Sequence, residues 1–218
     1  MNVQRAPAVS VYLPPSFAVR DPAAISRVLH EHPFATLITA THDEPQVSHV
    51  PLLHCADASP LGSLIGHVAH ANPHWERFGE GPTLALFHGP HAYVSPSWYS
   101  DPPAMVPTWN YIVVHVRGRI EAVNNRDETL AILSQLTERF ESSRAKPWRL
   151  QLEGARLDAL VGAIVGFHMT IERVDAKFKL SQNRSGRDRN RVIEALRGEG
   201  FSDAHATAEW MTGNAQDR

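Results

Sequence analysis

Cysteine is almost absent from this sequence, and long apolar runs are missing altogether. The single cysteine, Cys55, excludes a disulfide within the chain and is typical of a reducing compartment. No apolar stretch approaches the ~20 residues that a membrane-spanning helix needs. The first residues also lack the charged-then-apolar layout of a signal peptide. We therefore expect a cytoplasmic protein and exclude transmembrane, collagenous and coiled-coil classes.

Lysine is scarce as well, with 3 Lys against 18 Arg. The 21 basic and 23 acidic residues give a net charge of −2, so the chain as a whole is not built to bind nucleic acid by its charge. Seven basic residues nevertheless lie between Lys177 and Arg197. Histidine is in excess: there are 13, and seven of them lie between His49 and His91. These two concentrations are the features that need an explanation.

With 218 residues, 43% of them hydrophobic, the chain predicts one globular domain with an appendage. Short β-branched runs between turn signals predict a mainly β fold with peripheral helices (α+β), built on an antiparallel sheet or barrel. Asp21-Pro22 marks a helix start. The expected strands are 34–40, 46–54, 62–69, 83–88, 110–123 and 164–174, and the other expected helices are 127–140, 157–161 and 188–196. The expected domains are a flexible tail at 1–10, a core at 11–174 and a basic helical appendage at 175–218, within which 197–218 has no assigned role.

The sharpest local pattern is a strand that runs into Asn72-Pro73. Asn is a preferred helix cap and Pro suits the first helical turn, so backbone N–H groups after Asn72 would be free to bind an anion. His70 and His74 flank this point, and a phosphate would fit. The alternative is that Asn72 only caps a short helix.

Metal binding is a rival use of these histidines. His67, His70 and His74 have ligand-like spacing only if all three lie on one helix, and Pro73 places two of them before the helix begins. We therefore expect no metal site. The chain also lacks a phosphate-binding glycine loop and a dinucleotide fingerprint.

Two aromatic segments, 93–99 and 106–111, lie beside prolines. Their flat rings suit a planar ligand, because stacking contributes ~1 kcal/mol beyond burial. Alternatively, Trp98 and Trp109 anchor a core or a subunit interface. Lys179, Gln182, Asn183 and Arg184 gather hydrogen-bond donors ahead of a helix, where they would complete an anion site or contact DNA phosphates. The arginines that follow have the spacing of a solvated helix face.

Taken together, several motifs resemble one family, the FMN-binding negative transcriptional regulators of the PaiB type, named for protease synthesis and sporulation. The resemblance covers Val11 to Leu196. It implies a six-stranded antiparallel split β-barrel that forms a homodimer, like pyridoxamine-phosphate oxidase and flavin reductases, with FMN at the subunit interface. The motifs occur in the order Tyr12-Leu-Pro-Pro15, His32-Pro-Phe-Ala-Thr-Leu37, His49-Val-Pro51, Gly66-His-Val-Ala-His-Ala-Asn-Pro73, Tyr93-Val-Ser-Pro-Ser-Trp-Tyr99, Val106-Pro-Thr-Trp-Asn-Tyr111 and Lys179-Leu-Ser-Gln-Asn-Arg184.

The resemblance also implies roles for individual residues. One strand would border the flavin ring, a second would lie along its other edge, and a third group would take the phosphate. The strand that borders the ring contains Ser48, His49, Val50 and Pro51. The strand along its other edge contains His67 and Val68, and the residues at the phosphate are Asn72 and His74. A further set would lie on the ring or across the dimer: Trp109, Asn110, Lys179, Gln182 and Asn183.

Flavin oxidases usually place Arg and Lys at the phosphate, whereas Pro73 and His74 stand at the corresponding positions here. A neutral His74 would supply one hydrogen bond, and FMN affinity would then rise below a histidine pKa of ~6.5. The resemblance implies a repressor with DNA as a partner. The alternatives are an FMN-dependent oxidoreductase acting on a small molecule and, third, a haem- or metal-binding protein. No catalytic residue is identified.

Overall fold

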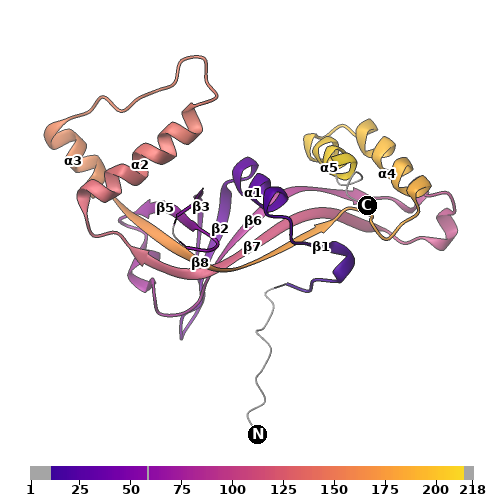
Figure 1. The fold of residues 1–218 in the computed structure, drawn as a ribbon, viewed down its shortest axis with the longest axis horizontal. Helices are drawn as coiled ribbons and strands as arrows, with labels where there is room; N and C mark the ends of the chain where they lie inside the picture. Colours follow the sequence, from indigo (N-terminus) through magenta and orange to yellow (C-terminus); the bar gives the residue numbers. More distant parts are fainter. Residues whose placement is uncertain (1–10, 58, 214–218) are drawn as a thin grey trace, which may run out of the picture. The chain divides into compact units, whose positions relative to one another are not determined.

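The computed structural model describes residues 11–57 and 59–213. The predicted tail at 1–10 therefore lies outside the described residues. Most strands precede the helices α2 to α5 in the chain, as Figure 1 shows. Their bounds are η1 (Pro15–Phe17), β1 (Ala18–Val19), α1 (Pro22–Glu31), β2 (Phe34–Thr39), β3 (Gln46–Pro51), β4 (Leu53–Cys55), β5 (Ser63–Ala69), η2 (Pro73–Arg77), β6 (Thr83–Val94), η3 (Pro96–Trp98), η4 (Pro102–Ala104), β7 (Thr108–Ala122), α2 (Arg126–Glu141), α3 (Gly154–Gly162), β8 (Ile164–Lys179), α4 (Gly186–Gly198) and α5 (Ser202–Gly213).

The strands form an 8-stranded sheet in the order β3-β2-β6-β7-β8-β5-β4, with β1 paired to β8. The mainly β prediction is confirmed, but the prediction of six strands is wrong. One reason lies at Leu52, which is buried and donates its N–H to the Pro33 carbonyl oxygen at 2.9 Å. This break divides the expected run 46–54 into β3, which pairs with β2, and β4, which pairs with β5.

Because β3 and β4 are the two edges of the sheet and follow one another in the chain, Leu52 brings these edges together. The sheet is not closed by hydrogen bonds between β3 and β4. Even so, the end of β3 at Pro51 lies close to the edge that β4 and β5 form.

The chain divides into two compact units, which we describe separately. Unit 1 comprises residues 1–25, 88–114 and 175–218, and unit 2 comprises residues 26–87 and 115–174. The division falls inside the three long strands β6, β7 and β8. The predicted boundary at residue 175 is also a unit boundary, but the C-terminal segment shares its unit with the hairpin of β6 and β7.

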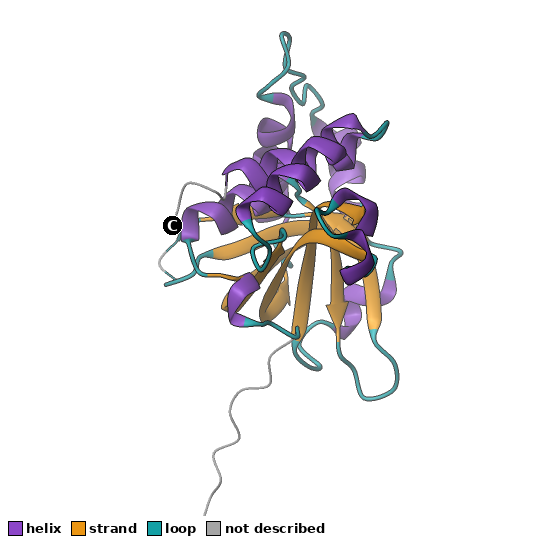
Figure 2. Cartoon of the chain, turned by 90° about the vertical axis from the view of Figure 1, so that its right-hand side faces the viewer, coloured by secondary structure: helices purple, strands orange, loops and turns teal. Residues whose placement is uncertain are grey.

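In unit 1, α4 and α5 pack together and cover one face of the strands (Figures 1 and 2). Phe178 of β8 meets Trp210 of α5 edge-to-face, with ring centroids 5.5 Å apart. In unit 2, α2 packs on β5 through a cluster that contains Ile65, Ile132 and Leu136. Both helical layers bury apolar side chains against the sheet, which is the main source of their stability.

Helix starts follow the expected capping rules. Asp21 accepts the N–H groups of Ala23 and Ala24 at 3.0 and 3.2 Å, which confirms the predicted start of α1. The expected helices at 127–140, 157–161 and 188–196 are present as α2, α3 and α4. Helix α5 was not predicted, because its buried face consists largely of small residues.

Two strands run further than predicted. β6 continues through Gly89-Pro90 to Val94, and β8 continues to Lys179. Gly89 allows this, because a Cβ there would lie 2.9 Å from the Cβ of Ile112 on β7. Among the described residues, no helix is long and apolar enough to cross a membrane.

Candidate functional site

Asn72 begins the short 3₁₀ helix η2, as its sequence context predicts. Its side-chain oxygen accepts the backbone N–H of His74 at 3.0 Å, and Pro73 occupies the first position. The helix has five residues, so its dipole is small and cannot by itself make an anion site. The chemistry of this corner therefore depends on side chains.

Those side chains form a buried polar chain across unit 2. The Asn72 amide donates from Nδ2 to Ser48 Oγ at 2.9 Å, and Ser48 Oγ lies 2.9 Å from His74 Nδ1. His74 Nε2 lies 2.9 Å from Thr39 Oγ1, which in turn lies 3.0 Å from Thr83 Oγ1. The structure thus brings together the three predicted residues Ser48, Asn72 and His74.

His74 sits at the centre of this chain and is 1% exposed. Burial lowers the pKa of its imidazole, because the charged form loses its hydration. Both ring nitrogens already have protein partners. The geometry therefore makes His74 a neutral bridging residue, and it does not support a gain of positive charge near pH 6.5 as the source of anion affinity.

A cavity of about 310 Å³ that is open to solvent lies where β3, β5 and α2 meet in unit 2. Pro51 and His67, two further predicted residues, both line it. Burial lowers the pKa of His67, and its buried Nδ1 has no hydrogen-bond partner among the described residues. An orphaned buried nitrogen is costly unless a ligand or water satisfies it. The other lining residues are Leu133, Leu136, Thr137, Phe140, Glu141 and Trp148.

The remaining predicted residues of this region have plainer surroundings. His49 is exposed, and its Nδ1 lies 3.2 Å from Thr36 Oγ1 on the neighbouring strand. Val50 and Val68 are buried, so their side chains contribute packing, and only their backbones remain to meet a ligand.

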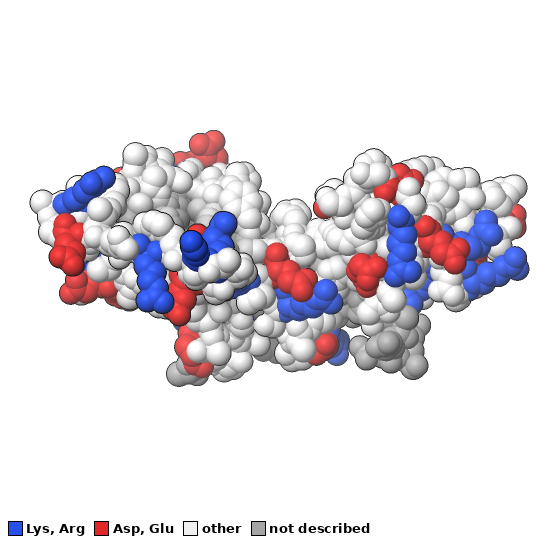
Figure 3. Space-filling view, turned by 90° about the horizontal axis from the view of Figure 1, so that it is seen from above, with Lys and Arg blue, Asp and Glu red and all other residues white. Residues whose placement is uncertain are grey.

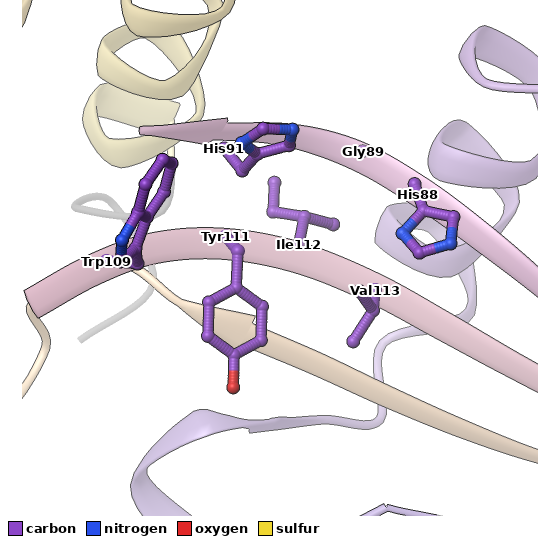
Figure 4. Close-up of a pocket in the computed structure, with 7 residues that line it drawn as sticks. All are labelled: His88, Gly89, His91, Trp109, Tyr111, Ile112 and Val113. Atoms are coloured by element: carbon purple, nitrogen blue, oxygen red, sulfur yellow. The ribbon is translucent and has the colours of Figure 1, made fainter. Parts of the chain in front are cut away.

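In unit 1, an aromatic face lies on the β6–β7 hairpin (Figure 4). Trp109 is 50% exposed and contacts His91 and Tyr93, with ring centroids 5.6 and 6.2 Å apart. It lines an open hollow of about 350 Å³ that includes His88, His91 and Tyr111. Two strands and their outward-facing rings make a surface suited to a flat ligand or a partner.

One cation of unit 1, Lys179, lies next to this aromatic face. Lys179 donates from Nζ to the Trp109 carbonyl oxygen at 2.6 Å and also bonds to Thr108 Oγ1. Burial and the nearby Lys177 and Arg184 lower the pKa of Lys179. The structure therefore places the predicted pair Trp109 and Lys179 together.

The other predicted polar residues of unit 1 are largely used internally. Asn110 is buried and bonds through Nδ2 to Ser181 Oγ at 3.0 Å. Gln182 accepts the Leu180 N–H at 2.7 Å and donates to the Phe178 carbonyl oxygen at 2.5 Å. Asn183 is exposed. Of these three, Asn183 keeps its amide open to solvent.

The basic segment also differs from a free helix face. Arg189 bonds to the Met211 carbonyl oxygen, and Arg191 bonds to that of Trp98 at 2.8 Å. Arg197 donates to Glu209 of α5 at 3.0 Å. Figure 3 shows basic side chains interspersed with acidic ones on the face it presents. The expectation of solvated arginines is wrong for Arg189, which is half-buried and bonds to backbone, whereas Arg191 is exposed as expected although it also bonds to backbone.

Sequence reasoning missed the inner end of the polar chain and most of the cavity wall. Thr39 and Thr83 are a cross-strand pair of β2 and β6, and nothing in the sequence pairs two threonines so far apart. Trp148 lies on the loop after α2, where no regular pattern exists. Leu133, Leu136 and Phe140 carried a signal, the apolar stripe of α2, but that stripe predicted packing rather than a cavity.

A family model described as "Putative FMN-binding domain" matches residues 11–173. Among characterised sequences, the "Protease synthase and sporulation protein PAI 2" of Bacillus subtilis is 36% identical over 205 residues, which cover 92% of this chain and 96% of that protein. An uncharacterized protein of Emericella nidulans is 29% identical over 226 residues, covering 85% of this chain and 90% of its own length.

Solved structures share the fold at low identity. The FAD and haem binding protein from Mycobacterium smegmatis superposes with a TM-score of 0.59 at 15% identity, covering 79% of this chain and 78% of that one. The flavocytochrome Anf3 from Azotobacter vinelandii gives a TM-score of 0.58 at 15% identity, covering 78% and 70%.

Proposed function

Since this chain belongs to the FMN-binding domain family and is a relative of the PAI 2 protein, we propose that it binds FMN at the corner of unit 2 where β3, β5 and η2 meet. The ring would occupy the cavity beside Pro51 and His67. The phosphate would lie at Ser48 and Asn72. Flavin is the cofactor class that the family supports, and FMN is the member proposed here.

Two observations carry this proposal: His67 lines a cavity of about 310 Å³, and its buried Nδ1 has no hydrogen-bond partner among the described residues. Flavin rings carry both hydrogen-bond donors and acceptors at their polar edge, so a neutral imidazole suits them in either tautomer. The volume falls in the range of small-molecule pockets. The residues present therefore fit a flavin.

When bound, FMN would supply hydride or single-electron transfer chemistry. The chain's own residues would bind and orient the ring and limit its contact with water. Pro51 and the apolar face of α2 would exclude water, and His67 would hold the polar edge of the ring.

We propose further that the protein is a homodimer of split-barrel protomers in which a second copy completes the flavin site. The exposed aromatic face around Trp109, with Lys179 beside it, would contact the flavin of the other copy. A half-exposed tryptophan among other exposed rings is the composition of an interface core.

For the biological role, we propose regulation of transcription, which rests on the resemblance of the sequence motifs to the PaiB-type regulators; the Bacillus subtilis relative is named for protease synthesis and sporulation. Arg187, one of the exposed arginines of α4, would contact DNA phosphates. An electrophoretic shift that is unchanged when Arg187, Arg189 and Arg191 are neutralised would remove this segment from that role.

The second candidate function is that of a flavin-dependent oxidoreductase, which the open aromatic hollow favours as a place for a small molecule. Bleaching of bound flavin by NADH or NADPH would separate the two.

The test of FMN binding is a titration of the purified protein with FMN, followed by visible absorbance and flavin fluorescence. We expect saturable binding, which His67→Ala weakens about tenfold, as loss of one hydrogen bond would. His205→Ala, at an exposed histidine of α5, serves as the control and should bind normally. No flavin band at any pH would contradict the proposal. Analytical ultracentrifugation tests the dimer.

A further inference from the structure

The polar chain of unit 2 has a direction, because its members become more exposed along it. Thr39 and Thr83 are 0% and 1% exposed, His74 is 1% exposed and Ser48 is 6% exposed, while Asn72 is half-buried. The inner end is therefore sealed in the protein. The outer end, at Ser48 and Asn72, is the part that a ligand can reach.

The proton count at Ser48 decides what this outer end can do. A hydroxyl has one proton to donate and two lone pairs to accept with. One lone pair is filled by the Asn72 amide, whose Nδ2 donates to Ser48 Oγ. The remaining lone pair and the proton are shared between His74 Nδ1 and any ligand that contacts Ser48.

The neutral imidazole of His74 offers two arrangements. If Nδ1 carries the proton, it donates to Ser48, and the Ser48 hydroxyl proton is then free to point outward. In that case Thr39 donates to Nε2 and Thr83 donates to Thr39, so the Ser48 hydroxyl proton is the one donor of this series that still needs an acceptor. If Nε2 carries the proton, all these bonds reverse and the Ser48 proton turns inward to Nδ1.

We propose that His74 is a positioning residue that selects the hydrogen-bond direction of Ser48, so that the phosphate of FMN is recognised by neutral donors through the Nδ1–H tautomer. This inference rests on the proposed FMN site. A phosphate oxygen is a strong acceptor without a proton to give, so it favours the arrangement in which Ser48 donates to it. No side chain of the polar chain is cationic, which explains how this site does without the Arg and Lys that flavin oxidases use.

The test is nitrogen-15 NMR of protein labelled at histidine, because imidazole nitrogen shifts distinguish the two neutral tautomers. Spectra are compared for the free protein, for its FMN complex and for its riboflavin complex, riboflavin lacking the phosphate. We expect FMN to place His74 in the Nδ1–H form and riboflavin to leave the tautomer of the free protein unchanged. An Nε2–H signal in the FMN complex, or the same response to both ligands, would overturn the inference.

Two variants provide a matched comparison. The side-chain amide of His74→Asn reaches the position of Nδ1, and that of His74→Gln reaches the position of Nε2. We expect His74→Asn to keep FMN affinity within about threefold and His74→Gln to lose at least tenfold, with riboflavin affinity equal in both. Equal FMN losses would mean that His74 acts only through folding. A wild-type protein that fails to bind FMN contradicts the proposed function, whereas FMN binding with the wrong tautomer contradicts this inference alone.

Discussion

Arg191 of α4 donates from Nε to the carbonyl oxygen of Trp98, 2.8 Å away. The residues are 93 positions apart in the chain, so this bond holds α4 to η3, the 3₁₀ helix that follows β6. A guanidinium used in this way stabilises the unit rather than serving as a free charge.

We expect Arg191→Ala to lower the free energy of unfolding by about 1 kcal/mol, the typical net value of a hydrogen bond. Arg187→Ala, at an exposed position of the same helix, should change it by less than about 0.5 kcal/mol. Urea denaturation of the two variants measures the difference. Equal effects would mean that the bond to Trp98 does not contribute.

Stability should fall when the solution is acidified. Burial lowers the pKa of His67 and His74 in the folded protein from an ordinary value of 6.5, and burial together with His91 lowers that of His88. Below pH 6.5 the unfolded chain binds more protons than the folded one, so stability rises with pH and is lost as pH falls through this window.

The measurement is the urea midpoint at pH 7.5 and pH 5.5. We expect a lower midpoint at pH 5.5 for the wild type. His67→Asn should show a smaller change, because it removes one of the titrating groups. A midpoint that is independent of pH would show that these imidazoles are not held neutral by burial.

Removing the side chains of Asn72, which caps η2, and His74, which bridges Ser48 and Thr39, should weaken FMN binding only moderately. Asn72→Ala combined with His74→Ala removes the donor to Ser48 and its positioning partner, so we expect a loss of a few kcal/mol at most in binding free energy. Asn72→Ala by itself should also cost about 1 kcal/mol in unfolding free energy through the lost cap. Fluorescence titration with FMN measures the binding. Unchanged affinity in the double variant would place the phosphate elsewhere.

Gly118 of β7 should tolerate no side chain. A Cβ at this position would overlap the backbone carbonyl oxygen of Thr170 on β8, and a backbone atom in a sheet cannot move aside easily. We expect Gly118→Ala to destabilise the protein by about 3 kcal/mol or more. Gly200→Ala, where nothing lies within 4 Å, is the control. Thermal unfolding of both variants tests this, and similar melting temperatures would contradict it.

Local signals in the sequence predicted the parts of this fold that depend on neighbouring residues. Asp21 and Asn72 were read as caps, because capping involves only the next two or three positions. The strands were found from their β-branched runs, although their ends were wrong where Gly89 and Pro90 gave a turn signal inside β6.

The site was only partly accessible from sequence. Motif resemblance named Ser48, Asn72 and His74, which the structure brings together, and Pro51 and His67, which share a cavity. It predicts that His74 contacts the phosphate, and it did not indicate the bonds of His74 to Ser48 and Thr39. A side chain's partners across strands are not visible in a linear pattern.

Composition and tertiary structure determined different properties of this protein. The scarcity of cysteine, the lack of long apolar runs and the near-zero net charge were determined by the sequence alone, because composition needs no coordinates. Only the tertiary structure decided the surroundings of the 13 histidines and 18 arginines, since burial lowers the pKa of His67 and His74. In the same way, hydrogen bonds to distant backbone occupy Arg189 and Arg191. The physical reason is that protonation, hydrogen bonding and exposure depend on neighbours in space, and the chain supplies those neighbours from far along its length.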